Sequence, residues 1–577
     1  MHHMTFKNST CQIWMRIQIN KKIAPLFILL SLFSTLYSQD IPDTIAQKID
    51  SLFAPWNNST GPGCAVGIVR NDSLIFSKGY GLADLEHEIP ITPKTIFYMA
   101  SVSKQFTGYA IVLLARQGKL NLDEDIHHYI PWAPEFGKKI TVRHLLNHTS
   151  GIRDDIYLSA LSGLGYGGML TQDLALNIIK RQRSLNFIPG EKYSYSNANF
   201  VLLAEIVKAV SGKSFRAFVD STIFKPLGMV NSRFQDDYTE LIPNRAWSYD
   251  ITDGKQVGNS FQNVYTLGDG GMFTNIIDMA KWVTNFYQPR AGDLNDIDQL
   301  TETGKLNNGK KINYALGIAV DHYRGWKEYE HSGGLAGYRT ILFVFPDLKM
   351  GFLIFSNMGN FNSQAKVHEL ANLFIPDTTK SNKEDKPEAR DSSHAMLKDP
   401  LQYTRFTGDY LGEDGDQFSF SISNQKMYAS SYGQSTLLLQ ESKDTFSLFT
   451  NPAVKFVFQF SSQKTSLVHL YWPEDNKLMR KYVPDSIQSD KTLQAYTGTY
   501  YSPELDCHFS ISLKEHHLVL SSNKYADKPL MLIGKDDILD KNGLLSYIKI
   551  RRDRMDKIIG FEVNSGIIRH LRFNKVK

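Results

Sequence analysis

The stretch Thr95-Ile-Phe-Tyr-Met-Ala-Ser-Val-Ser-Lys104 decides the fold, because a serine and a lysine three residues apart open an apolar segment. After Ser101, apolar side chains recur at helical spacing, and Gly118 is a stop signal, so we expect a helix over 101–120. A helix N-terminus presents unpaired backbone N–H groups, which would hold an oxyanion while Ser101 attacks a carbonyl. Lys104 would lie on the same face, one turn away.

The Ser-x-x-Lys spacing alone identifies nothing, since it recurs at five other places: Ser363/Lys366, Ser423/Lys426, Ser461/Lys464, Ser521/Lys524 and Ser546/Lys549. An ordinary lysine has a pKa of about 10.4 and is a poor base near neutrality. Burial and a neighbouring positive group lower that pKa and produce a proton acceptor. Taken in isolation, the pattern is more often a surface serine and lysine at the start of a helix.

A second element, Tyr195-Ser-Asn197, precedes another apolar helical stretch at 200–210 and follows a turn at Pro189-Gly190. Tyr195 there can relay protons, and Asn197 can donate to a substrate amide and hold the lysine. The alternative is a polar helix cap, a common place for serine and asparagine.

A third element, His331-Ser-Gly-Gly334, leads into a strand that begins near Thr340. Gly333 and Gly334 would let a substrate backbone lie close to the edge of that strand, and the Gly334 N–H could complete an oxyanion pair with that of Ser101. The alternative is a simple hairpin turn.

In this order the three elements resemble the motifs of the penicillin-recognising serine hydrolases, which include class C β-lactamases, D-Ala-D-Ala carboxypeptidases and D-aminopeptidases. Further blocks look like the same family: Leu145-Leu-Asn-His-Thr-Ser-Gly151, Pro226-Leu-Gly-Met229, Gly270-Gly-Met-Phe-Thr274, Asp278-Met-Ala-Lys-Trp282 and Tyr314-Ala-Leu-Gly317. The resemblance spans about 41–374. It implies an α+β fold, a β-lactamase/transpeptidase-like domain with an antiparallel sheet flanked by helices and a helical subdomain. The site would lie between the two, and His148 would be structural.

His331 departs from the pattern, because β-lactamases of this family usually carry lysine there. That lysine helps attract the substrate carboxylate, whereas histidine is only partly charged near neutrality. Family members with His-x-Gly include D-aminopeptidases, D-stereospecific amidases and esterases. We therefore expect a serine hydrolase that acts on amide or ester bonds. Ser101, Lys104 and Tyr195 would be catalytic, with Asn197, His331, Gly333 and Gly334 around the substrate and its oxyanion.

Two other functions stay open at this stage: a β-lactamase or D-Ala-D-Ala carboxypeptidase, and a non-catalytic protein that binds cell-wall fragments. The expected substrate is a small peptide, amide, ester or β-lactam-like molecule. The mechanism needs no metal and no organic cofactor, and the sequence shows no Cys/His spacing typical of zinc.

The C-terminal part predicts further domains. Residues 376–400 are polar and read as a solvated linker after a catalytic domain at 39–375. Strand patterns follow, and Arg405-Phe-Thr-Gly-Asp-Tyr410 resembles Ala495-Tyr-Thr-Gly-Thr-Tyr500. Such a repeat predicts two small antiparallel β-barrel-like domains, at 401–485 and 486–577. This layout also resembles that of D-aminopeptidases.

The N-terminus indicates where the protein is located, and the composition limits the classes of partner. Lys21 and Lys22 precede the uncharged, apolar stretch 23–38, so we expect a signal peptide at 1–38 and a secreted or periplasmic protein with no membrane span after cleavage. The alternative is a membrane span, for which about 20 apolar residues are needed. The 577 residues are 42% hydrophobic and 21% charged, which is typical of a globular protein. The net charge is only +5 and the basic residues are dispersed along the chain, so the sequence shows no basic patch typical of nucleic-acid binding. The oligomeric state is left open.

Overall fold

The computed structural model describes residues 41–577, apart from 165–166, 253–255, 380–394, 398, 432–433, 450, 461–465, 473–475, 484–487, 523–524, 541–542, 544 and 577. The predicted signal peptide, 1–38, lies outside the described residues, as does most of the predicted linker. Among the helices that are described, none is both long enough and apolar enough to cross a membrane.

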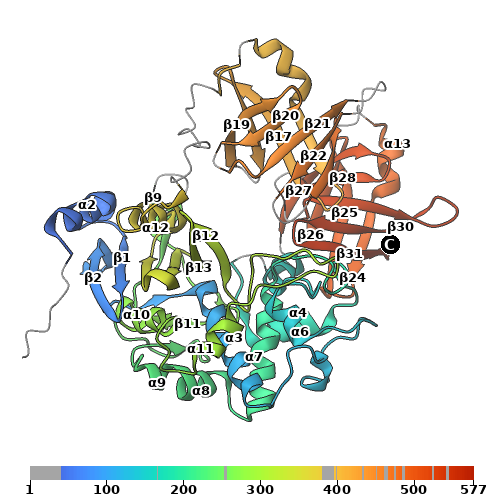
Figure 1. The fold of residues 1–577 in the computed structure, drawn as a ribbon. Helices are drawn as coiled ribbons and strands as arrows, with labels where there is room; N and C mark the ends of the chain where they lie inside the picture. Colours follow the sequence, from blue (N-terminus) through green and yellow to red (C-terminus); the bar gives the residue numbers. More distant parts are fainter. Residues whose placement is uncertain are drawn as a thin grey trace, which may run out of the picture. The chain divides into compact units, whose positions relative to one another are not determined.

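Residues 42–375, the described part of the predicted catalytic domain, are here called the catalytic region. Its centre is a six-stranded antiparallel sheet (Figure 1). Its strands, in spatial order, are β12 (Ala319–Tyr323), β13 (Trp326–Leu335), β14 (Tyr338–Phe345), β15 (Met350–Ser356), β1 (Cys64–Arg70) and β2 (Ser73–Tyr80). In the sequence, the apolar runs 64–70 and 73–77 flank Asn71-Asp72, a turn signal that predicts a strand pair, and the structure shows this pair as β1 and β2. Residues 340–345 and 350–355 are continuously apolar, which is typical of central strands, and they form the buried middle of the sheet.

Helices cover both faces of this sheet. Helix α10 (Ile276–Asn285) packs on β1 and β15, whereas α12 (Ser363–Ala371) packs on β14 and β15, with α2 (Asp43–Phe53) beside it. A Cβ atom on Gly351 would lie 2.4 Å from Val283 of α10, so this glycine lets the helix approach the sheet. Phe352, the next residue along, contacts Phe374, which follows α12. Because neighbouring strand residues point to opposite faces, the two helices lie on opposite sides of the sheet.

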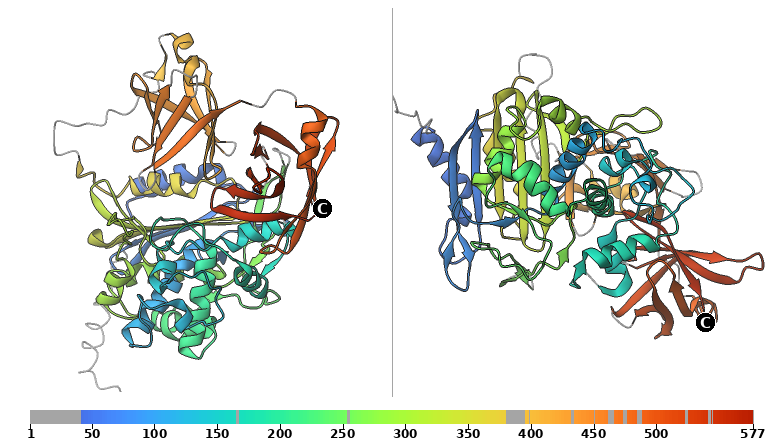
Figure 2. Two further views of the ribbon diagram at one scale, coloured as in Figure 1. Left: turned by 90° about the vertical axis from the view of Figure 1, so that its right-hand side faces the viewer. Right: turned by 90° about the horizontal axis from the view of Figure 1, so that it is seen from below.

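A helical subdomain surrounds α3, and its other helices pack mainly around α3 and α7 (Figure 2). Its elements are η2 (Ala100–Ser103), α3 (Lys104–Arg116), α4 (Val142–Leu146), α5 (Asp155–Ser159), η4 (Ala160–Leu164), α6 (Gln172–Arg181), α7 (Asn197–Ser211), α8 (Phe215–Val219), α9 (Lys225–Leu227) and α11 (Leu294–Leu300). Every residue of α3 from Lys104 to Leu114 is buried, as is typical of a central helix. The helix is shorter than predicted: Ser101 lies in a 3-10 turn, and the α-helix begins at Lys104.

Short strands complete the catalytic region: β3 (Leu82–Asp84), β4 (Ile89–Pro90), β5 (Phe97–Tyr98), β6 (Leu170–Thr171), β7 (Arg233–Phe234), β8 (Tyr249–Thr252), β9 (Gln256–Asn259), β10 (Val264–Tyr265) and β11 (Met272–Thr274). Strand β11 pairs with β5 on one side and with β7 on the other. The small sheet thus leads the chain from β5 directly into the turn that carries Ser101.

Two closed antiparallel barrels form the C-terminal part. The first barrel consists of β16 (Gly408–Gly412), β17 (Gln417–Ser423), β18 (Lys426–Ser431), β19 (Gln434–Ser442), β20 (Thr445–Leu448), β21 (Lys455–Phe460), β22 (Ser466–Tyr471) and β23 (Asn476–Tyr482). The second barrel consists of β24 (Gly498–Ser502), β25 (Cys507–Lys514), β26 (His517–Ser522), β27 (Tyr525–Gly534), β28 (Asp537–Leu539), β29 (Tyr547–Arg552), β30 (Ile558–Ser565) and β31 (Ile568–Lys575). In each barrel the first strand pairs with the last.

The predicted repeat is confirmed by a matching detail in the two barrels. Tyr410 and Tyr500 are both buried on the first strand of their barrel. The Tyr410 hydroxyl donates to the carbonyl oxygen of Phe406 at 3.3 Å, and the Tyr500 hydroxyl donates to that of Tyr496 at 2.6 Å. Both bonds span four residues, so the same chain reversal opens both barrels.

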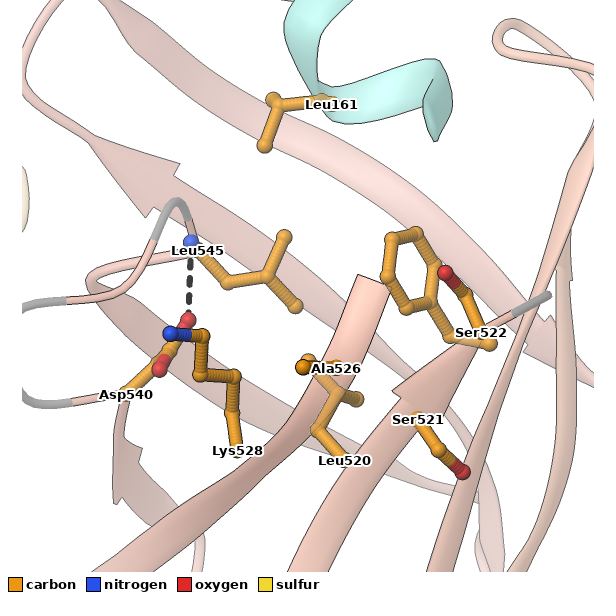
Figure 3. Close-up of a pocket in the computed structure, with 9 residues that line it drawn as sticks. Leu161, Leu520, Ser521, Ser522, Ala526, Lys528, Asp540 and Leu545 are labelled. Carbon is orange, nitrogen blue, oxygen red and sulfur yellow. Dashed lines mark hydrogen bonds between the residues drawn. The ribbon is translucent and has the colours of Figure 1, made fainter. Parts of the chain in front are cut away.

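The second barrel shares a hydrophobic core with the catalytic region, here called the shared core. Catalytic-region residues Leu158, Leu161, Leu170, Ala175, Ile178 and Val264 belong to one buried cluster with barrel residues that include Tyr500, Ile548, Phe561 and Phe573. Figure 3 shows Leu161 of η4 lining an apolar pocket together with Leu520 and Leu545 of the barrel. The first barrel has a separate core of its own.

Candidate active site

Ser101 lies in a turn that is fixed from both sides. Ala100, just before it, has φ +47°, a left-handed conformation that residues with a side chain rarely adopt, and such strain persists only where the surroundings enforce it. The Met99 N–H donates to the carbonyl oxygen of Met272 at 2.8 Å, and the Thr340 hydroxyl donates to that of Met99 at 2.9 Å. The turn is therefore held between β11 and β14, and Ser101 remains partly exposed.

The structure brings the three predicted catalytic side chains together. The hydroxyl of Tyr195, which enters from the segment before α7, donates to Ser101 Oγ at 2.8 Å. Lys104 Nζ lies 3.2 Å from the same oxygen. Burial raises the pKa of Tyr195 above its ordinary value, so its phenol keeps the proton that it donates. The protonated Lys104 amine donates to Ser101 Oγ, and only after it loses that proton can the Ser101 hydroxyl donate to it.

Lys104 is fully buried, and its amine can lose a proton at mildly alkaline pH. Nζ lies 2.8 Å from Asn197 Oδ1 and 2.7 Å from the carbonyl oxygen of Asp269, both hydrogen-bond acceptors. Burial lowers the pKa of Lys104 to about 8, against the opposing charges of Asp269 and Asp154. A neutral amine has two N–H groups and one lone pair. The two acceptors take the N–H groups, which leaves the lone pair for the Ser101 hydroxyl.

Asp154, which the sequence analysis did not single out, orients the Asn197 amide. Its Oδ2 accepts from the backbone N–H of Asn197 at 2.7 Å and from Asn197 Nδ2 at 2.8 Å. The amide oxygen must therefore point the other way, toward Lys104. Asp154 also caps α5, because its Oδ1 accepts from the Tyr157 N–H at 2.8 Å. An aspartate just before the apolar residues of 156–161 is a helix-start signal that could have found it.

His331 is held as a neutral side chain by the fold itself. Its Nδ1 lies 2.7 Å from the carbonyl oxygen of Ser332, and its Nε2 lies 2.9 Å from the hydroxyl of Tyr314. A carbonyl only accepts, so Nδ1 carries the hydrogen and Nε2 accepts from Tyr314. Burial, with the charge of Lys104, lowers the pKa of His331 to about 3. The partial positive charge considered from the sequence is thus absent at neutral pH, and the substrate contact of His331 stays a prediction.

Gly333 and Gly334 lie on a stretch of β13 that passes directly beside Ser101. Strand β12 pairs with β13 only as far as Glu330. Among the strand pairings described, residues 331–335 of β13 therefore pair with β14 on one side only. A Cβ atom on Gly333 would lie 2.2 Å from the carbonyl oxygen of Met99 and 3.2 Å from the Ser101 nitrogen. Gly333 therefore permits the close approach, and the next residue, Gly334, is exposed.

This approach yields a prediction about Gly333. The change Gly333→Ala would push β13 and the Ser101 turn apart, because backbone lies within 3 Å of the added carbon. A displacement of about 1 Å lowers the rate by roughly 10²-fold, and we expect this loss in single-turnover acylation by a fluorophosphonate. Gly334→Ala meets its nearest atom at 3.6 Å, a side-chain nitrogen of Arg339, and should lose far less. Equal losses in the two variants would contradict the steric argument.

His148 lies behind Tyr195 rather than beside the nucleophile. Its ring is fully buried, with its centroid 4.3 Å from that of Tyr195 and 5.0 Å from that of Phe200. Its Nδ1 accepts from the Ser196 N–H at 3.2 Å. Burial holds its pKa well below the ordinary value. His148 thus supports the ring of Tyr195 as a neutral packing partner.

The family model described as Beta-lactamase matches residues 49–375, more than half of the chain. The chain belongs to the β-lactamase family. A penicillin-binding protein of Bacillus subtilis is 27% identical over 388 residues, covering 64% of this chain and 84% of that protein. A D-aminopeptidase of Brucella ovis is 30% identical over 326 residues, covering 55% of this chain and 61% of that enzyme. The chain thus spans less than two thirds of the length of the D-aminopeptidase.

Two solved structures share the β-lactamase-family fold with this chain. The octameric penicillin-binding protein homologue from Pyrococcus abyssi is 23% identical with a TM-score of 0.53, covering 76% of this chain and 99% of that one. The penicillin-binding protein from Bacillus halodurans is 21% identical with a TM-score of 0.50, covering 56% of this chain and 100% of that one. At these identities the likeness shows the fold alone.

As a member of the β-lactamase family, the chain is a serine hydrolase. Sequence motifs pointed to the side chains around Ser101, but they missed Asp154, Tyr314 and the carbonyl of Asp269. Tyr314 lay in a block already recognised as family-like, yet its bond to His331 appears only in three dimensions. Within the described residues, no three His, Cys, Asp or Glu side chains are grouped as ligands for a metal ion.

Proposed function

We propose that this β-lactamase-family protein hydrolyses amide bonds of small peptides or amino-acid amides, or the corresponding esters, through an acyl-enzyme on Ser101. The observation that supports this most strongly is the contact of Ser101 Oγ with both Tyr195 and Lys104. Tyr195 donates a hydrogen bond to this oxygen, and Lys104, once deprotonated, offers a lone pair to the Ser101 proton.

In the proposed reaction, Ser101 Oγ bonds to the substrate carbonyl carbon while its proton passes to Lys104 Nζ. Backbone N–H groups of Ser101 and Gly334 stabilise the oxyanion. The bond to the leaving amine or alcohol then breaks, and the leaving group takes a proton that Tyr195 relays from Lys104. Water hydrolyses the ester of Ser101 by the reverse sequence of proton transfers.

The state of His331 favours amide and ester substrates over β-lactams. A cation at this position would attract a β-lactam carboxylate, and His331 does not supply one, because it is neutral and both of its ring nitrogens are bonded within the protein. The D-aminopeptidase relative supports the same choice. A β-lactamase or D-Ala-D-Ala carboxypeptidase is the second candidate, supported by the match to a penicillin-binding protein.

The test is covalent labelling of the purified mature protein with a fluorophosphonate, followed by mass analysis of the labelled peptide. We expect one adduct, on Ser101, and none in Ser101→Ala. Turnover of D- and L-aminoacyl amides, short esters, nitrocefin and a peptide ending in D-Ala-D-Ala then separates the candidates. An adduct on another residue, or hydrolysis undiminished in Ser101→Ala, would refute the mechanism. Stable ligand binding without turnover would favour the binding-protein alternative.

A further inference from the structure

We infer that the second barrel positions the catalytic Lys104, through contacts that run from Arg153 to Asp154 and on to Asn197. This inference rests on the proposed function, since it concerns the same Ser101 site. It gives the second barrel a part in the reaction, in addition to any part in binding a partner.

Arg153 is the first link, and the second barrel provides most of its partners. The side chain is fully buried, and its Nη1 lies 3.0 Å from Glu504 Oε2. Its Nε donates to the carbonyl oxygen of Arg569 at 2.9 Å, and its Nη2 donates to that of His570 at 3.4 Å. A buried guanidinium is tolerated only when it is paired and hydrogen-bonded. The other two hydrogen bonds of the guanidinium go to the carbonyl and hydroxyl oxygens of Ser184, and the backbone of Arg153 is held separately within the catalytic region. The barrel therefore supplies three of the five hydrogen bonds that hold the Arg153 side chain.

Asp154 is the second link, and it is anchored on its other side as well. It caps α5, and the side chains of Leu158 on α5 and Leu161 on η4 belong to the shared core. Asp154 thus lies between an ion pair to the second barrel and a helical segment buried against that barrel. Any shift of the barrel would move Asp154 from both ends.

Asn197 is the third link and contacts the catalytic amine directly. Asp154 Oδ2 holds the Asn197 side-chain nitrogen, so the amide oxygen faces Lys104 Nζ at 2.8 Å. If Asp154 moves away, the amide can rotate and present its N–H groups to the lysine. Lys104 then loses an acceptor, and its lone pair no longer points at Ser101.

A second ion pair joins the same two parts of the chain and provides a matched control. Arg181 Nη1 lies 3.4 Å from Asp506 Oδ2, but the two side chains are 41% and 61% exposed. Such exposed pairs contribute little to stability. The structure shows no contact from Arg181 to Asp154 or to the Ser101 site among the described hydrogen bonds and ion pairs.

The experiment uses the full-length protein and measures single-turnover labelling of Ser101 by a fluorophosphonate. Arg153→Met is made alone and together with Glu504→Gln, which avoids leaving a buried unpaired carboxylate. Asp154→Ser is the partner variant, because serine still caps α5 but is too short to reach Asn197. We expect the Arg153 change to slow labelling by about 10- to 100-fold, with near-ultraviolet circular dichroism retained. Arg153→Lys should recover part of the rate, and Arg181→Met should label like the wild type.

The double-mutant cycle separates positioning from general damage. If Arg153 acts through Asp154, the Arg153 change should have no further effect in the Asp154→Ser background. An equal loss in both backgrounds, or wild-type labelling in Arg153→Met, would overturn the inference while the proposed function stands. If Arg153→Met does not fold, Glu504→Gln replaces it, because glutamine keeps the shape of the glutamate but removes its charge. Glu504→Gln is then combined with Asp154→Ser, and the labelling rates are judged in the same way. Absence of Ser101 labelling in the wild type would overturn both proposals.

Discussion

Replacing Lys104 by methionine should slow the acylation of Ser101 by ~10²- to 10⁴-fold, the usual contribution of a positioned proton-transfer group. Methionine fills a similar buried volume but cannot accept the proton of the Ser101 hydroxyl. The measurement is single-turnover labelling and steady-state hydrolysis of the best amide or ester substrate. Lys366→Met is the matched control, since Ser363 and Lys366 repeat the spacing on α12, and no effect on the rate is expected there. Similar losses in both variants would contradict the assignment.

The same lysine gives the wild-type enzyme its pH dependence. Only the neutral amine accepts a proton, and the pKa of Lys104 is lowered to about 8. The acylation rate should therefore rise with pH through about 8 and level off above it, with the protonated, inactive form dominating below. This rising limb should be missing from whatever activity Lys104→Met retains. A wild-type rate that falls over the same interval would rule out Lys104 as the base.

A chain that ends at residue 485, after the first barrel, should not yield soluble, labelled protein. Its truncation would expose the catalytic-region side of the shared core, which includes Leu158, Leu161 and Val264. Truncating one buried leucine to alanine costs about 2–5 kcal/mol, and a whole domain has only about 5–15 kcal/mol of stability. The truncation removes the packing partner of all six catalytic-region residues of the shared core, so the free energy lost should exceed the stability of the domain. The measurement is the soluble fraction and the labelling of Ser101.

A point variant tests the same feature in the complete chain. Leu161→Ala should lower the free energy of unfolding by about 2–5 kcal/mol, as followed by denaturant titration. Leu401→Ala is the control, because its side chain is 79% exposed and should change stability little. A soluble, fully labelled chain ending at 485 would show that the catalytic region folds without the second barrel.

The sequence predicted which side chains meet at Ser101 because each belongs to a short motif with fixed spacing. Ser101 and Lys104 are neighbours on one turn, and the Tyr195 and His331 elements follow in a recognisable order. The strands around Asn71 and the tyrosine repeat of the barrels were predictable for the same reason, since local patterns report local structure.

The rest of the site depends on contacts between distant parts of the chain. Asp154 orients Asn197 from 43 residues away, and no spacing rule marks that pair. Leu158 and Leu161 show as apolar positions, but periodicity reports only that a side chain is buried and not what covers it. For this reason the sequence predicted a second barrel as a separate domain and missed the core that it shares with the catalytic region.

The shared core also bears on how the protein is made. Arg153 and Glu504 are 351 residues apart, so a ribosome adding 5–20 residues per second needs on the order of 20–70 s to produce the second after the first. For most of that interval the nucleophile, its lysine and its tyrosine exist in the nascent chain, but the guanidinium of Arg153 lacks its partners in the second barrel. Contacts of such long sequence separation also form slowly once synthesis is complete. We therefore expect the Ser101 site to be complete only after the second barrel has been made, and chains that stop between His331 and that barrel should carry all the motifs without the full site.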